Sequence, residues 1–138
     1  MKTAKIFAPL LACGVLFSGV ASAQVMEPAK ADATTTKVRQ ATYACSKGGN
    51  ITVTYGFNKQ NLPTYAEAHL GGKKRFLPIN LAHSDMAGTS FGDENSWTIG
   101  GSALTLRNYH KSDVLILDPN SEIQYKHCKV VNTKRIKG

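Results

Sequence analysis

The sequence has few acids, few cysteines and a single long apolar run, and each shortage excludes a class of protein. Nine Asp and Glu stand against 17 Lys and Arg, which gives a formal net charge of +8. The apolar run lies at the very start, which excludes a polytopic membrane protein. With 42% hydrophobic residues, 12 Gly and 5 Pro, the 138 residues are typical of one folded domain, not of a disordered tail or a collagenous repeat.

The first 23 residues have the parts of a secretory signal peptide. Residues 1–5 are cationic, residues 6–20 are apolar, and residues 21–23 have the Ala-x-Ala form that signal peptidase cleaves. About 15 apolar residues are fewer than the roughly 20 that a membrane-spanning helix needs. We therefore expect cleavage between Ala23 and Gln24, which leaves a mature chain of 115 residues.

Cysteine is scarce, with three in the chain. Residues 10–14 also resemble a lipoprotein cleavage box that would lipidate Cys13, but the apolar run continues past this cysteine, which favours cleavage after Ala23. That cleavage leaves Cys45 and Cys128, and two cysteines in an exported domain predict one disulfide. No Cys-x-x-Cys spacing is present, so we expect neither a metal nor another cofactor.

Changes in composition divide the chain into four parts. After the signal peptide (1–23), residues 24–42 are rich in Ala and Thr and lack apolar periodicity, which predicts a flexible leader. Residues 43–131 consist of short alternating runs and predict the folded domain. Residues 132–138 form a basic C-terminal tail.

The alternating runs predict β-strands. Along residues 51–57 the apolar side chains fall on one face and the threonines on the other, as in a half-buried strand. Turn-forming residues separate the runs, and no window of eleven residues has a helical stripe. The pattern predicts an all-β fold, a small antiparallel β-barrel of about eight strands closed by one disulfide. Further expected strands lie at residues 65–70, 97–99, 104–106, 114–117 and 123–128.

Catalytic motifs are absent from the sequence. Residues 83–85 contain His, Ser and Asp, but neighbours on an extended chain point to opposite faces and do not form a triad. The four histidines show neither His-x-His nor His-Glu-x-x-His spacing. No glycine-rich phosphate loop is present. We therefore expect a protein that is not an enzyme.

Positive charge gathers in two places. One is a run of three cations after a Gly-Gly pair, and the last thirteen residues hold five more with no acid. For an exported protein the expected anionic neighbours are lipid headgroups, lipopolysaccharide or host glycans, and not nucleic acid. A solvated tail without a partner is the alternative. The basic patches comprise Lys73, Lys74, Arg75, Lys134, Arg135 and Lys137.

One stretch is more specific than these patterns. Residues 53–60, Val-Thr-Tyr-Gly-Phe-Asn-Lys-Gln, resemble the adhesin complex protein family of pathogenic Neisseria. The resemblance runs from about Tyr43 to Cys128. It implies a small β-barrel exported to the Gram-negative envelope, either the periplasm or the outer-membrane surface, and linked to adhesion and to inhibition of c-type lysozyme. The same resemblance continues at Leu62, 64–66, 78–81, Ser84, Asp85, Tyr109, Lys111, 119–120 and Cys128.

The family is also similar in shape to the membrane-bound and periplasmic inhibitors of c-type lysozyme. Those inhibitors present a Ser-rich loop, here residues 84–90, and then a Trp-x-Lys-Gly element, here residues 97–100 with Ile99 in place of the Lys. Such a loop would enter the lysozyme cleft and pair with its two catalytic carboxylates. The contact residues that the resemblance implies are Ser84, Asp85, Thr89, Ser90, Tyr109 and Lys111.

Two functions follow from the resemblance. The first is inhibition of c-type lysozyme by this polar loop. The second is an adhesin or surface-binding module whose basic patches bind host cells or anionic envelope glycans.

C-type lysozymes are strongly basic, and the mature chain carries fifteen Lys and Arg against nine Asp and Glu, so long-range steering toward lysozyme would be repulsive. A monomer and a homo-oligomer are both compatible with the sequence.

Overall fold

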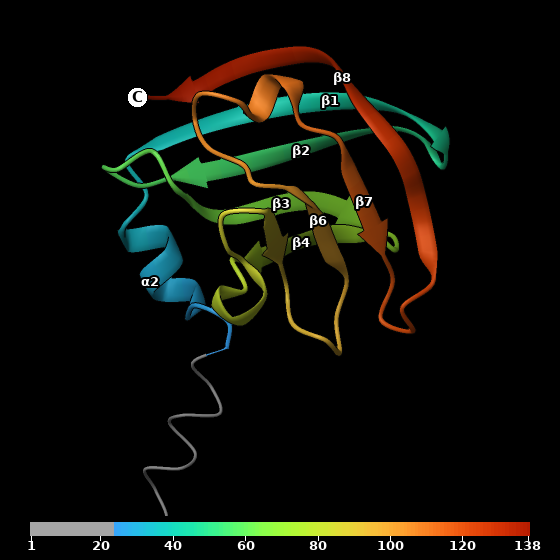
Figure 1. Cartoon of the computed structure of the whole chain (residues 1–138), viewed down its shortest axis with the longest axis horizontal. Coiled ribbons are helices and arrows are strands. Elements are labelled where there is room, and N and C mark those ends of the chain that lie inside the picture. The colour runs from blue at the N-terminus through green and yellow to red at the C-terminus, as the bar shows by residue number, and fades with distance from the viewer. Residues whose placement is uncertain (1–23) are drawn as a thin grey trace, which may run out of the picture.

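The computed structural model describes residues 24–138, and an eight-stranded antiparallel sheet curls into a nearly closed barrel (Figure 1). The predicted signal peptide, including Cys13 and Ala23, lies outside the described residues. The barrel confirms the predicted all-β fold. Its strands are β1 (Lys37–Lys47), β2 (Gly49–Phe57), β3 (Pro63–Leu70), β4 (Lys73–Pro78), β5 (Gly88–Phe91), β6 (Thr98–Ser102), β7 (Val114–Leu117) and β8 (Ile123–Lys137).

The strand order places the two ends of the chain side by side. The order is β4-β3-β2-β1-β8-β7-β6-β5, so β1 and β8 are neighbours in the middle of the sheet. Cys45 on β1 lies opposite Cys128 on β8, and a disulfide with an S–S distance of 2.09 Å joins them. The single predicted disulfide is confirmed. It connects the first and last strands, whereas the two edges of the sheet meet elsewhere, between β4 and β5.

Period-two alternation fills the barrel with apolar side chains. On β2, Ile51, Val53, Tyr55 and Phe57 are all buried, because every second residue of a strand faces the same side of the sheet. Aromatic rings from other strands complete this core, as where Tyr55 meets Phe91 with ring centroids 5.7 Å apart. Burial of these rings is the main source of the barrel's stability.

The predicted flexible leader, residues 24–42, is wrong. Helix α2 (Pro28–Ala33) lies within it, and β1 begins at Lys37. Pro28 suits the first turn of a helix, where its missing N–H leaves no intrahelical bond unmade. Ala31 is fully buried, and its carbonyl accepts a 2.7 Å hydrogen bond from the Thr35 hydroxyl. The Thr35 hydroxyl also lies 2.5 Å from the Thr64 hydroxyl on β3, and this contact, with the buried Ala31, holds the helix against the barrel.

The predicted basic tail, residues 132–138, is also a misassignment. β8 continues to Lys137, which lies opposite Val38 on β1. Two further strands, β4 and β5, were not expected, because β4 opens with three cations and β5 consists mostly of small polar residues. Residues 104–106 are not a strand but lead into the short helix η2 (Tyr109–Lys111).

The seam between β4 and β5 is closed by a few backbone contacts. Ile79 and Phe91 form an isolated antiparallel bridge, and the Gly92 amide donates to the Pro78 carbonyl over 2.9 Å. The first residues that the structure describes also contact this seam, because Val25 forms an isolated antiparallel bridge with Asn80. Within residues 24–138, no helix has both the length and the apolar character to cross a membrane.

Candidate functional site

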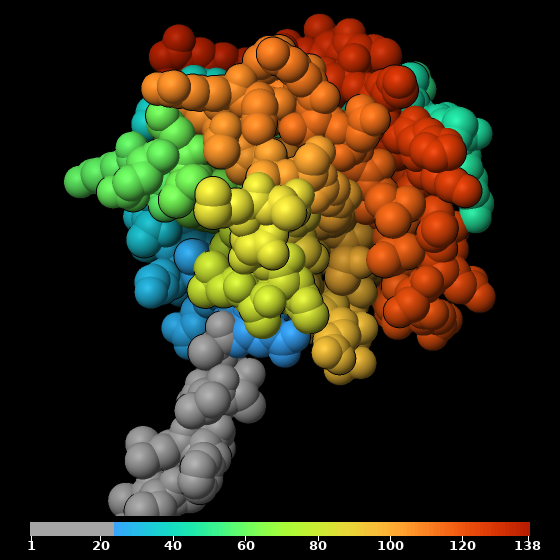
Figure 2. Space-filling view, viewed as in Figure 1, coloured from blue at the N-terminus to red at the C-terminus, as the bar shows by residue number. Residues whose placement is uncertain are grey.

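The loop between β4 and β5, residues 79–88, contains two of the six predicted lysozyme-contact residues, Ser84 and Asp85, and Thr89 and Ser90 follow it directly on β5. Short helix η1 (Leu81–His83) lies within it. Figure 2 shows this loop, coloured yellow-green to yellow, at the surface between the orange segment that includes η2 and the blue chain start. We refer to residues 79–88 as the β4–β5 loop.

Asn80 fixes the base of the β4–β5 loop. Its side chain is buried and donates to the Gly92 carbonyl over 3.0 Å, while its Oδ1 accepts from the amides of Ala82 and His83, both over 3.1 Å. Its backbone amide donates to the Ser90 carbonyl over 2.8 Å. One side chain therefore caps η1 and closes the barrel seam at the same time. An Asn directly before a turn is a recognisable signal in the sequence, but no role was predicted for it.

Ser84 and Asp85 are used to shape the loop itself. The Ser84 Oγ accepts from the Ser90 amide over 2.9 Å and donates to the Ser90 carbonyl over 3.3 Å. Asp85 Oδ1 accepts from the amides of Ala87 and Gly88, over 2.8 and 3.0 Å. The polar atoms that were expected to contact lysozyme thus hold a tight turn, which makes these residues positioning groups.

Thr89 and Tyr109 are buried, with relative exposures of 7% and 8%. The Thr89 hydroxyl accepts from the Leu104 amide over 2.9 Å, and the Tyr109 ring packs on Phe57 with centroids 5.8 Å apart. Neither side chain can reach a partner without opening the core. Lys111 is exposed on η2 and is the one predicted contact residue that presents its charge to solvent without an internal bond among the described residues.

The tip of the β4–β5 loop exposes apolar side chains that the sequence analysis did not select. Met86 is 96% exposed and Leu81 is 51% exposed, the largest values among the exposed aliphatic side chains of the loop. Large apolar groups at such exposure on a tied loop are typical of contact surfaces. The signal in the sequence was a Met within a run of small and polar residues.

Residues 24–26, the first that the structure describes, form hydrogen bonds with the same loop. The Gln24 carbonyl accepts from the Leu81 amide over 2.7 Å, and the Met26 amide donates to the Ile79 carbonyl over 3.0 Å. The Gln24 side-chain amide also lies 3.2 Å from His83 Nε2. Gln24, the first residue after the predicted cleavage, is therefore a structural part of the candidate site.

The two basic patches are brought together only in part. Lys74 on β4 and Lys137 on β8 line one groove on the outer wall of the barrel. Arg75 turns away from it: its Nε donates to the Leu70 carbonyl over 2.7 Å and its guanidinium lies 6.0 Å from the Trp97 ring. Among the described residues, no group of three or more His, Cys, Asp and Glu side chains could hold a metal ion.

Comparisons with known proteins place these features in context. A family model described as an ACP-like domain (Nm-ACP) matches residues 39–130. The solved structure of the adhesin complex protein from Neisseria meningitidis is similar, with 37% sequence identity and a TM-score of 0.62. The match covers 67% of this chain and 98% of that chain. A search of curated proteins gives no match.

Proposed function

The chain belongs to the family of ACP-like domains, and on this premise we propose that it is an exported, surface-associated bacterial protein that inhibits c-type lysozyme through the β4–β5 loop. The observation that carries the proposal is the shape of this loop, whose base is held by hydrogen bonds and whose tip exposes apolar side chains. Asn80, Ser84 and Asp85 fix the backbone, and Met86 stands clear of the barrel. A loop ordered before binding loses little conformational entropy when it enters a cleft.

The chemistry of contact differs from the one expected from the sequence. Ser84, Asp85 and Thr89 already have internal partners, so they set the loop's shape. Met86 would occupy an apolar part of the substrate cleft, and the exposed imidazole of His83 supplies a donor for a lysozyme carboxylate. Occupying the cleft blocks the two carboxylates that cleave the glycosidic bond.

The placement of charge supports an approach by this loop. Residues 76–106 contain Asp85, Asp93 and Glu94 and no Lys or Arg, although the whole chain is basic. Asp85 on the loop would therefore attract a basic lysozyme, whereas Asp93 lines a hollow together with Lys73, Lys74 and Arg75, whose charges oppose its own. Cations farther from the contact are screened beyond about 8 Å at physiological salt. The repulsion expected from net charge is reduced where contact would occur.

Hydrolysis of bacterial cell walls by a c-type lysozyme tests the proposal. Titration with the full chain, purified from the export fraction with its disulfide formed, should abolish lysis at stoichiometric amounts. Met86→Asp should weaken inhibition about 30-fold, the loss typical of a contact worth about 2 kcal/mol. Val131→Asp is the matched control, because Val131 is an aliphatic residue on β8 with 61% exposure. Undiminished lysis, or equal losses in the two variants, would contradict the proposal.

Adhesion is a second candidate function. The similar structure is named an adhesin complex protein. In this chain the cation-rich strand β8 lies away from the β4–β5 loop (Figure 1). Binding of the labelled protein to host epithelial cells would test it. Saturable binding that Met86→Asp leaves unchanged would separate adhesion from lysozyme inhibition.

A further inference from the structure

The positive charge of the barrel is concentrated on two neighbouring strands. β1 and β8 together carry eight Lys and Arg and no acid. The rest of residues 24–138 carries seven Lys and Arg against nine Asp and Glu. Because β1 and β8 are hydrogen-bonded neighbours, cations from opposite ends of the sequence lie on adjacent strands, although alternation distributes them over both faces of the sheet; we refer to this strand pair as the basic ribbon. From the sequence alone, only the cations of the C-terminal strand, β8, were recognised as a cluster.

This basic ribbon has a cost in stability. Arg39 lies directly opposite Arg135, and Lys47 lies directly opposite Lys126. Like charges in directly opposed positions destabilise a strand pair. Among the described residues the one ion pair is Lys74–Glu67, at 4.0 Å, so no carboxylate neutralises the ribbon. An uncompensated charge of this kind suits the binding of an anion.

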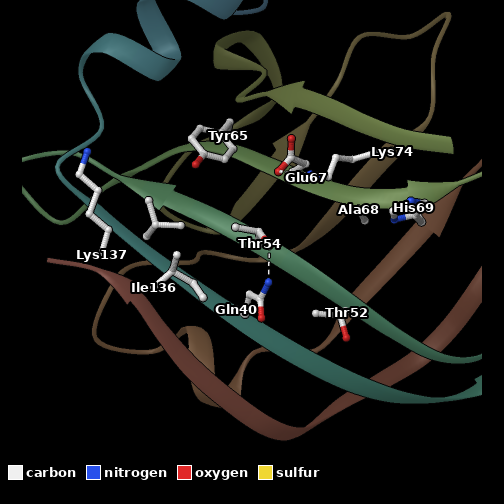
Figure 3. A pocket seen from close by; sticks show the side chains of 11 residues that line it. Gln40, Thr52, Thr54, Tyr65, Glu67, Ala68, His69, Lys74, Ile136 and Lys137 are labelled. Atoms are coloured by element: carbon white, nitrogen blue, oxygen red, sulfur yellow. Dashed lines mark hydrogen bonds and ion pairs between the residues drawn. The ribbon is translucent and has the colours of Figure 1, made fainter.

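A groove of about 520 Å³ lies beside the ribbon, on the outer wall of the barrel (Figure 3). Lys137 lies at one end, His69 and Lys74 lie at the other, and amide and hydroxyl side chains lie between them. This volume is within the range of small-molecule sites. The side chains that line the middle are Gln40, Thr52, Thr54, Tyr65 and Glu67.

The groove offers side-chain chemistry rather than backbone pairing. Its floor is formed by β1, β2 and β3, which are each paired on both sides, so the floor has no open strand edge; the end of β8, residues 129–137, pairs with β1 alone. Its concave shape does not fit a flat membrane surface. Apolar parts of Val38 and Ile136 lie among hydroxyl, amide and carboxylate groups, a mixture that suits the C–H faces and hydroxyls of sugar rings.

Individual groups in the groove are prepared for hydroxyl-rich ligands. The Gln40 Nε2 donates to the Thr54 Oγ over 3.2 Å, which orients the Gln40 carbonyl and the Thr54 hydroxyl. The Tyr65 hydroxyl is a neutral donor at physiological pH, and burial, followed by the charges of Glu67 and Asp32, raises its pKa further. Glu67 can accept hydrogen bonds from sugar hydroxyls, and its carboxylate lies 4.0 Å from the Lys74 ammonium group. An anionic substituent would therefore compete with Glu67 for Lys74, whereas Lys137 has no ion pair among the described residues.

We propose that this groove binds an acidic oligosaccharide, a sugar chain that carries carboxylate or sulfate groups, with Lys74 and Lys137 at its two ends. The site gives the adhesion candidate a defined location and ligand class. It is separate from the β4–β5 loop, so lysozyme inhibition neither requires it nor depends on it.

Isothermal titration of the exported, oxidised full chain with a heparin-derived tetrasaccharide tests the site. The tetrasaccharide should bind at physiological salt, and neutral maltotetraose should not. Lys137→Gln, Lys74→Gln and Gln40→Leu should each weaken binding about tenfold, as expected for the loss of one hydrogen bond to a charged or oriented group. Lys59→Gln removes an exposed cation outside the groove and should leave affinity within about twofold. If Gln40→Leu does not fold, Thr52→Val replaces it.

Three results would overturn this inference: no binding of the tetrasaccharide, equal losses in Lys59→Gln and Lys137→Gln, or losses confined to the lysine variants. The last would mean that the basic ribbon attracts polyanions without the groove. Host-cell binding that persists in variants with an inactive groove would retain the adhesion candidate and overturn the assignment of adhesion to this groove.

Discussion

The hydroxyl groups of Tyr43 and Tyr55 lie 2.6 Å apart inside the barrel, and neither residue is exposed to solvent. One hydroxyl donates to the other, so each of the two oxygen atoms has a hydrogen-bond partner in the apolar core. A buried hydroxyl that lacks a partner costs about 1–3 kcal/mol. The relationship between these two residues on β1 and β2 therefore gives two predictions.

The first prediction concerns removal of one hydroxyl. Tyr43→Phe leaves the Tyr55 hydroxyl unpaired in the core and should lower the free energy of unfolding by about 2 kcal/mol. Tyr43→Phe combined with Tyr55→Phe should lose less than twice that amount, because no unpaired group remains. Urea unfolding of the three proteins measures this difference. Strict additivity of the two substitutions would show that the hydroxyl pair contributes nothing jointly.

The second prediction concerns alkaline pH. Burial raises the pKa of Tyr43 from 10.0 to about 12, and burial also raises the pKa of Tyr55. Unfolded tyrosines lose their protons near pH 10, whereas the folded ones do not, so the stabilisation is complete below pH 10 and falls as the pH rises toward about 12. Thermal unfolding across this range should show the fall. The double Phe variant should show a shallower fall, and identical pH profiles would contradict the argument.

A third prediction concerns the seam. Asn80→Ala removes the bonds to the Gly92 carbonyl and to the amides of Ala82 and His83, and should lower the free energy of unfolding by about 3 kcal/mol. Asn95→Ala, an exposed Asn on the loop after β5, should change it by less than about 0.5 kcal/mol. Chemical unfolding compares them. Equal small effects would mean that the Asn80 side chain does not hold the seam.

Loss of the disulfide gives a fourth prediction. The Cys45–Cys128 bridge has a sequence separation of 83 residues. Closing a loop of that length lowers the entropy of the unfolded chain and so stabilises the folded state by about 4 kcal/mol. Replacing both cysteines with Ser should reduce the free energy of unfolding by about that amount. Reductant should destabilise the native protein similarly and should leave the Ser variant unaffected. A native protein that is indifferent to reductant would contradict this contribution.

The fifth prediction concerns the rate of association with lysozyme. Asp93→Asn with Glu94→Gln removes two acids from the acidic segment that includes the β4–β5 loop, and should slow association with a basic lysozyme by about threefold at low salt. Lys134→Gln with Lys137→Gln, on the basic ribbon, should speed it slightly. Stopped-flow or surface-based kinetics distinguish the two pairs. The opposite order of effects would place the contact on another face.

The strands that the sequence predicted are those with a local apolar signal. Residues 51–57 and 114–117 carry enough buried side chains to identify β2 and β7. β4 and the second half of β8 carry cations, and only their pairing with β3 and β1 makes them strands. The β1–β8 pairing is long-range, so no local pattern records it, whereas β4 follows β3 through the Gly71–Gly72 turn and was missed because exposed cations open it. Helix α2 is six residues long, too short for a periodic signal.

The lysozyme-contact segment stays a prediction, but the structure shows what several of its side chains already bond to. Residues 84–87 lie in the β4–β5 loop and residues 88–90 in β5, and Ser84 and Asp85 bond to the backbone of this segment. Ser and Asp residues compete for nearby amides in any tight turn, and a sequence does not show whether that bond or a partner uses the oxygen. Tyr109 was selected for its hydroxyl, whereas its ring fills the core.

The pairing of β1 with β8 also sets the order of events during synthesis. A chain that emerges from its N-terminus has β1 and β2 available early, but the ladder between β1 and β8 must wait for the final 15-residue strand. Contacts between such distant segments make folding slow, because a long loop must close before they form. The partly synthesised chain therefore cannot complete the barrel until its last strand is available to pair with β1.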